Sequence, residues 1–114
     1  MSAAEDLLEL HLKTEKKNLF YEREFAAVPD RKFRFDFLVT GKTAGPWIKQ
    51  PQTLVEVQGG VWLKGKSGHS SGTGITRDCE KLSLAAVHGY RCIVVTPAQI
   101  KSGLAIGWIK AALT

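Results

Sequence analysis

The sequence predicts a single α/β domain, residues 1–114, in which helices flank a central mixed β-sheet. The chain has 114 residues, of which 44% are hydrophobic, so it is long and apolar enough for one core. Its apolar patterns follow the order helix, three strands, helix, strand, helix, which is typical of a helix-and-sheet layer structure. The sequence contains no internal repeats that would indicate a solenoid.

Two elements are predicted at the start of the chain. Residues 3–13 have the pattern of a helix, because acidic residues lie in the first turn and a lysine lies near the end, as the helix dipole favours. Residues 19–25, with the sequence LFYEREF, are predicted to form the first strand.

The second strand, residues 33–39, alternates most clearly. Its three phenylalanines are expected to share one face of the sheet, and Arg34 and Asp36 are expected on the other. Glycines and prolines in residues 40–52 predict a turn or loop.

The third strand, residues 53–58, presents a carboxylate and an amide together. A period of two residues places Glu56 and Gln58 on one face and two valines on the other. Residues 59–74 hold six of the eleven glycines and are expected to form a loop.

A second helix is predicted at residues 76–88. Thr76 is its expected N-cap, and Gly89 lies just beyond its C-terminus. Three residues at helical spacing are expected to face the core: Cys79, Leu82 and Ala86.

The last two predicted elements are a strand and a helix. The continuous apolar run at residues 91–96 indicates a strand that is central in the sheet and covered on both faces. Residues 102–113 indicate a helix, which is expected to pack through Leu104, Ile109 and Leu113.

Charge and composition restrict the partners and the compartment. The net charge of +5 and the pI of about 9.4 suit a polyanion such as nucleic acid, although a basic chain also owes solubility to its charge. No signal-peptide pattern or membrane-length apolar run is visible, so we expect a cytoplasmic protein without a membrane partner. Cys79 and Cys92 fit a reducing compartment and are expected to be small buried residues.

Two carboxylates indicate a candidate site. Asp36 and Glu56 lie on successive predicted strands, and they converge if those strands are neighbours. Two such charges repel each other unless a cation lies between them, and hard oxygen ligands suit Mg²⁺ or Mn²⁺. In the alternative without a metal, Asp36 pairs with Arg34 or Arg91. Glu56 then pairs with a lysine.

The order of several motifs resembles a nuclease family. An acid on one strand, followed about twenty residues later by acid-x-lysine on the next, is the pattern of the PD-(D/E)XK nucleases, and here it reads Asp36, then Glu56-Val57-Gln58. Six motifs resemble, in order, the stand-alone VRR-NUC proteins of phages and prophages over nearly the whole chain: FRFDF, EVQGGVW, SGHSSGTG, DCEK, HGYRCIVVTPAQI and SGLAIGWIKAAL. This resemblance implies a restriction-endonuclease-like core with the order αβββαβ.

The resemblance also implies site residues. The implied metal ligands are Asp36, Glu56, the Val57 carbonyl and Glu5. Glu9 is the alternative to Glu5, which without a metal only complements the helix dipole. Gln58 takes the place of the family's usual lysine, and an amide only orients a catalytic water. Lys81 is the candidate for supplying the missing charge, unless it forms an exposed ion pair with Asp78.

The implied function is that of a metal-dependent, structure-specific DNA endonuclease, with four-way (Holliday) junctions as the leading substrate. The residues expected to contact DNA are Arg34, Lys64, Lys66, His69 and Arg77. Paired cuts by a chain with one site imply a homodimer, in a bacterial or phage-infected cell. Two alternatives are a non-catalytic DNA-binding module of the same fold, which the glutamine favours, and a nuclease specific for flaps, nicks or mismatches.

Overall fold

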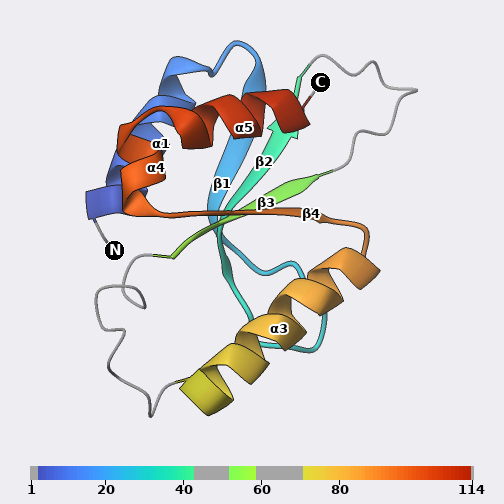
Figure 1. Ribbon diagram of the computed structural model, residues 1–114. Coiled ribbons are helices and arrows are strands. Elements are labelled where there is room, and N and C mark those ends of the chain that lie inside the picture. The colour runs from blue at the N-terminus through green and yellow to red at the C-terminus, as the bar shows by residue number, and fades with distance from the viewer. Residues whose placement is uncertain (1–2, 43–51, 59–70, 114) are drawn as a thin grey trace.

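A four-stranded sheet with helices on both faces forms the described part of the chain, residues 3–42, 52–58 and 71–113, in this computed structural model (Figure 1). The strands are β1 (Leu19–Phe25), β2 (Phe35–Gly41), β3 (Thr53–Val57) and β4 (Arg91–Val95). They lie in the order β1-β2-β3-β4, with the first two pairs antiparallel and the last pair parallel. The predicted α/β class with a mixed sheet is confirmed.

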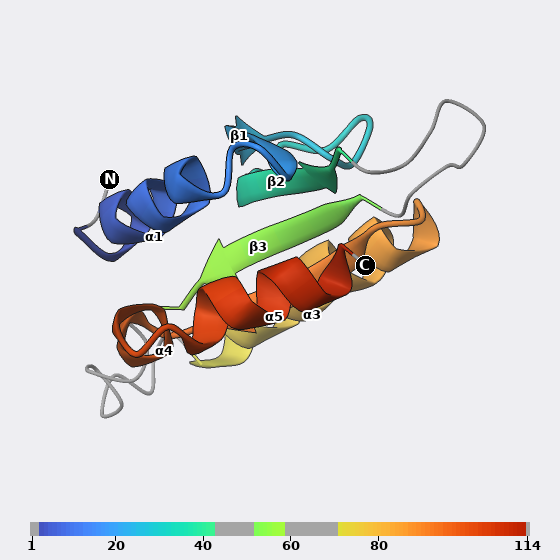
Figure 2. The same cartoon turned by 90° about the horizontal axis from the view of Figure 1, so that it is seen from above.

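The helices divide between the two faces of the sheet. They are α1 (Ala3–Thr14), α3 (Ser71–Val87), α4 (Pro97–Lys101) and α5 (Leu104–Ala112). Figure 1 shows α1, α4 and α5 gathered above the sheet and α3 below it, and Figure 2 shows β1, β2 and β3 following one another across it. None of the described helices has the length and apolar character needed to cross a membrane.

Each face of the sheet packs its own core. The core below α1, α4 and α5, here called the α5 core, includes Leu8, Leu12, Phe37, Val39, Val55, Val95, Ile100, Ala105 and Ile109. The core on the other face, here called the α3 core, includes Ala27, Val28, Phe33, Phe35, Leu54 and Ala85. Burial of these side chains is the main force that holds helices and sheet together.

β2 contributes to both cores, because its alternation is interrupted at Asp36. Phe33 and Phe35 pack in the α3 core, whereas Phe37 packs in the α5 core. The prediction that the three phenylalanines share one face is therefore wrong.

The backbone of β1 gives the physical reason. Glu24 lies between two cross-strand pairs, Arg23 with Phe37 and Phe25 with Phe35. Its φ of 54° is in the left-handed region, which a residue with a side chain adopts only at a cost. Such a residue turns the strand and changes which face the following side chains meet, while the register of β1 with β2 is kept. Both strands therefore change faces at the level of Asp36.

The helix α3 differs from its prediction in start and in orientation. It begins before Thr76, which is an interior residue and not the N-cap, and it includes the last residues of the predicted 59–74 loop. Cys79 and Ala86 are exposed, and of the three predicted core residues only Leu82 packs against the α3 core. Ala85 is fully buried instead, because its small side chain lets the helix approach the sheet.

The C-terminal part also differs in detail. β4 is an edge strand of the described sheet and not a central one, although α3 and α5 both contact it. The sequence did not predict α4, whose N-cap is Thr96, and Thr96 forms a capping box with Gln99. The predicted 102–113 helix is α5, which starts after Gly103. Its predicted packing residues Ile109 and Leu113 are buried, whereas Leu104 is exposed.

We predict that a pair of double-mutant cycles detects the change of face. Phe37→Leu and Ile109→Val alter the same core, so their effects on the free energy of unfolding are expected to couple by about 0.5–1 kcal/mol. Phe35→Leu alters the other core and is expected to add to Ile109→Val within about 0.3–0.5 kcal/mol. Equal coupling of both phenylalanines to Ile109, measured by urea unfolding, would place them on one face.

Candidate active site

Two carboxylates continue the pairing of β2 and β3 where the backbone ladder ends. The register runs from Val39–Thr53 to Phe37–Val55. At the next position the backbone N–H of Asp36 donates to Glu56 Oε1 at 2.9 Å, and the N–H of Val57 donates to Asp36 Oδ2 at 2.8 Å. Each carboxylate thus takes a place that a backbone carbonyl takes in a regular ladder. The prediction that the two strands are neighbours is confirmed, and each acid accepts a hydrogen bond from the backbone of the other strand.

Lys81 joins this arrangement from α3. Its Nζ lies 2.6 Å from Glu56 Oε2, and both side chains are only 15% exposed. The same Nζ lies 4.6 Å from the centre of the Phe35 ring. Glu56 is therefore paired with a lysine, as the alternative without a metal expected. That lysine points into the site, and not to Asp78 along its own helix.

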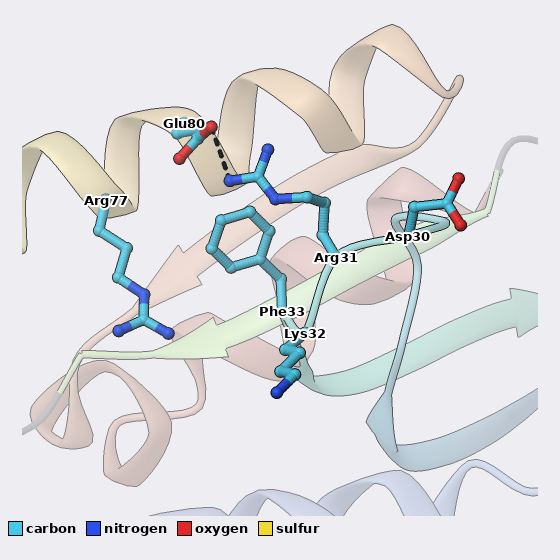
Figure 3. A pocket seen from close by; sticks show the side chains of 6 residues that line it. All are labelled: Asp30, Arg31, Lys32, Phe33, Arg77 and Glu80. Atoms are coloured by element: carbon cyan, nitrogen blue, oxygen red, sulfur yellow. Dashed lines mark ion pairs between the residues drawn. The ribbon is translucent and has the colours of Figure 1, made fainter.

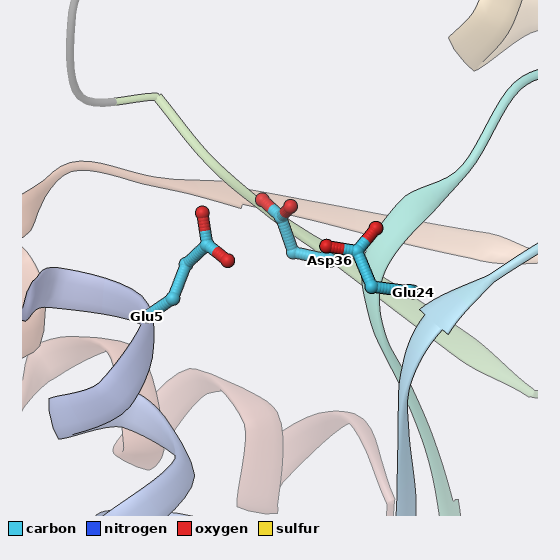
Figure 4. A group of neighbouring side chains, drawn as sticks. All are labelled: Glu5, Glu24 and Asp36. Carbon is cyan, nitrogen blue, oxygen red and sulfur yellow. The ribbon is translucent and has the colours of Figure 1, made fainter. Parts of the chain in front are cut away.

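Three acids gather on the other side of Asp36. Glu5 of α1, Glu24 of β1 and Asp36 each offer a carboxylate oxygen, and these oxygens lie within 4.8 Å of one another (Figure 4). Glu24 is exposed, so this cluster is open to solvent. Glu24 was not among the predicted site residues, since its only signal in the sequence is its place among the polar residues of LFYEREF.

Arg23 fixes the acidic side of α1 above the sheet. Its guanidinium donates to Glu5 at 3.1 Å, to Asp6 at 3.2 Å and to Glu9 at 2.9 Å. It also lies 5.4 Å from the centre of the Phe37 ring, and its side chain is 17% exposed. The helix is thereby held with Glu5 near Asp36.

Glu9, the alternative to Glu5, is not part of this group of three carboxylates. It accepts a hydrogen bond from Tyr21 Oη at 2.8 Å, in addition to that from Arg23. These two bonds lower the pKa of its carboxyl, in that order of importance. Glu9 therefore belongs to the contact between α1 and β1.

The charge of Asp36 is unfavourable in this surrounding. The pKa of its carboxyl is raised to about 6, chiefly by burial, and the charges of Glu56 and Glu5 act in the same direction. The hydrogen bond from the Val57 N–H and the charge of Lys81 act in the opposite direction. A divalent cation beside Asp36 would relieve both the desolvation and the repulsion.

The donor set fits a hard cation. Asp36, Glu5 and Glu24 offer carboxylate oxygens, which Mg²⁺ and Mn²⁺ prefer. This set differs from the predicted ligands, because Glu24 is added while both oxygens of Glu56 already have protein partners. Carboxylate oxygens carry two lone pairs each, so Glu56 retains capacity to bind.

The remaining predicted residues are divided between the site, its surroundings and the undescribed chain. Val57 pairs with Val95 in the parallel ladder, and the half-buried Gln58 donates its backbone N–H to the Val95 carbonyl at 2.7 Å. Arg34 donates to the backbone carbonyl of Glu24 at 3.2 Å. Arg77 is exposed on α3. Three predicted DNA contacts lie outside the described residues: Lys64, Lys66 and His69.

Comparison with known proteins adds no relative to these observations. No family model matches the chain, and no curated protein or solved structure matches it. Inferences about function therefore rest on the geometry of the site and on the motifs in the sequence.

We predict that Asp36→Asn stabilises the metal-free protein above pH 6. The folded-state pKa of about 6 exceeds the ordinary value of 3.8, so wild-type stability is lost as the pH rises through this window. An asparagine oxygen still accepts from Val57 and carries no charge. The variant is expected to equal wild type near pH 4 and to exceed it by about 1–2 kcal/mol at pH 8, after allowance for partial solvation.

Urea unfolding in chelator across pH 4–8 measures this difference. The matched control is Asp78→Asn, which makes the same change at an exposed carboxylate on α3. A wild-type protein that stays as stable as Asp36→Asn at pH 8 would contradict the described environment of Asp36.

Proposed function

We propose that the chain is a Mg²⁺- or Mn²⁺-dependent endonuclease that hydrolyses phosphodiester bonds in DNA, with a restriction-endonuclease-like core. One observation carries the proposal: Asp36 and Glu56, 20 residues apart, meet on neighbouring strands with Lys81 on the second acid. This is the acid, acid and lysine set of the resembled nucleases, with the lysine supplied by a helix. The order of the described elements, from α1 through β1–β3 and α3 to β4, supports the same core.

The roles follow from the contacts. Asp36, with Glu5 and Glu24, would hold the cation, whose charge stabilises the transition state of phosphodiester hydrolysis. The Lys81 ammonium pairs with Glu56 and has further N–H donors for a phosphate oxygen. Gln58 follows Glu56 by two residues, and its amide orients the attacking water.

The substrate and assembly belong to the proposal as well. The motif resemblance favours branched DNA, with four-way junctions first. Symmetric cuts across a branch need two sites, and the described residues present one such pair of acids on neighbouring strands, Asp36 and Glu56. A homodimer with two-fold symmetry supplies the second site.

A second candidate function is a non-catalytic DNA-binding module. The specific observation in its favour is that both oxygens of Glu56 are occupied, one by the Asp36 N–H and one by Lys81. A half-buried ion pair of this kind also serves structure alone, since removing either partner strands the other charge. The two candidates differ in whether the site cleaves DNA.

We predict cleavage that depends on metal and on both acids. Purified protein is expected to cut a four-way junction in Mg²⁺ and not in chelator. Asp36→Asn and Glu56→Gln are each expected to lower the single-turnover rate by at least about 100-fold, the scale of a lost catalytic contact. Asp78→Asn on the surface of α3 is the matched control, with unchanged rate. Cutting by Asp36→Asn at the wild-type rate would refute the site assignment, and no cutting of junction, flap or linear DNA by wild type would favour the binding module.

A further prediction separates Gln58 from Lys81. Gln58→Ala is expected to lower the single-turnover rate about 10- to 1000-fold, while Gln58→Lys retains activity. If Lys81 supplies the positive charge that the strand lacks, Lys81→Ala is expected to lower the cleavage rate as much as Asp36→Asn does. The double variant Gln58→Lys/Lys81→Ala then recovers part of the rate, because the charge returns to the strand. Unfolding measurements on each variant exclude loss of the fold, and failure of the double variant to recover rules out an exchange of roles.

A further inference from the structure

A second charged region lies between α3 and the connection from β1 to β2 (Figure 3). It is near the site formed by Asp36, Glu56 and Lys81, which we call the acid site. This second region contains a cleft of about 380 Å³ and an adjoining one of about 400 Å³, which share Arg31, Lys32 and Phe33 in their linings. We call the two together the basic cleft. Its four cations are Arg31, Lys32, Arg34 and Arg77.

Positive charge dominates the basic cleft. Arg31 is paired with Glu80, at 2.7 Å between Nη2 and Oε2. Figure 3 shows the Asp30 carboxylate at the edge, directed away from Arg77. Lys32 and Arg77 form no ion pair with any described residue, and both are exposed. Two cations are thus available to an anionic ligand without breaking an internal pair.

The aromatic ring in the basic cleft is covered. Phe33 is 7% exposed, with the Arg31 guanidinium 4.8 Å and the Arg77 guanidinium 6.0 Å from the ring centre. Proteins that hold single-stranded bases do so by stacking them on open aromatic rings. Phe33 offers no open face, so the lining presents guanidinium and ammonium donors, which suit phosphate oxygens.

The basic cleft and the acid site lie next to each other along α3, as two contacts of this helix with phenylalanine rings show. Arg77 lies over Phe33, and Lys81, one helical turn later, lies over Phe35. Four residues of helix advance about 6 Å along its axis. Arg77 in the cleft and Lys81 at Glu56 are therefore about one helical turn apart on the same side of α3. A polyanionic strand that followed α3 would therefore meet Arg77 in the basic cleft and then Lys81 beside Glu56.

We infer that the basic cleft binds the phosphate backbone of a nucleic-acid strand without reading its bases, and directs that strand to Asp36 and Glu56. The inference rests on the proposed function for the direction of the strand, and on the cleft alone for the binding. Glu80 limits the affinity, because it neutralises Arg31 in the absence of a ligand.

Binding is measured by fluorescence anisotropy in the Asp36→Asn background, which removes cleavage. Two labelled duplexes of equal length, one rich in A·T and one rich in G·C, are titrated between 50 and 200 mM salt. Lys32→Ala/Arg77→Ala is expected to raise Kd about tenfold or more, equally for both duplexes, and to reduce the salt slope by about two. The matched control, Lys13→Ala/Lys17→Ala, removes the same charge from exposed positions at and after α1 and is expected to change Kd less than threefold.

A change of opposite sign sharpens the test. Glu80→Gln frees Arg31 and is expected to lower Kd about threefold, whereas Glu22→Gln, an exposed residue of β1, makes the same change in net charge with little effect. Equal effects of the cleft and control variants would overturn the inference, since overall charge would then explain the binding. Loss of affinity for only one duplex would overturn binding without base reading.

Cleavage assays separate this inference from the proposed function. If wild type cuts no DNA but Lys32→Ala/Arg77→Ala binds more weakly than its control, the nuclease proposal fails and the basic cleft stands. If wild type cuts DNA and the cleft variants change neither Kd nor KM, the inference fails and the nuclease proposal stands.

Discussion

The exchange of hydrogen bonds between Asp36, Glu56 and the facing backbone is the interaction on which the rest of the structure depends. Each carboxylate accepts an N–H from the other strand, so β2 and β3 stay joined after their regular ladder ends. A charged acceptor makes such bonds stronger than a neutral carbonyl does. The exchange also fixes the second oxygen of Glu56 on the side of α3, where Lys81 meets it. Strand pairing and the geometry of the site are therefore one arrangement.

Several unfavourable features collect at this one level of the sheet. The left-handed Glu24, the half-buried Asp36 with its raised pKa and the half-buried pair of Glu56 with Lys81 all lie there. Backbone strain and charge repulsion persist only where the surrounding structure compensates for their cost. Here the packing of the two cores and the ion pairs of Arg23 with α1 stabilise this region. Such a concentration is typical of sites that bind a cation or carry out chemistry.

The parts of this arrangement that depend on local pattern were predictable. The residues expected to form β1 and β3 match the observed strands nearly to the residue, and Asp36 and Glu56 lie on successive predicted strands that do pair. The parts that depend on tertiary structure were not. A left-handed glutamate has no sequence signature, so the change of face in β2 and the arrival of Glu24 beside Asp36 stayed hidden. The orientation of α3 follows from packing of Ala85 on the sheet, and helical spacing alone favoured another side.

We propose that Asp36 belongs to a cation site, and the protons released when a metal binds report on it. With a pKa of about 6, Asp36 is about half protonated at pH 6 and ionised at pH 8. Titration calorimetry with Mn²⁺ in buffers of different ionisation enthalpy counts these protons. We predict saturable binding that releases about half a proton per cation at pH 6 and almost none at pH 8. Absence of saturable binding at pH 8, or binding at pH 6 without proton release, would contradict the claim.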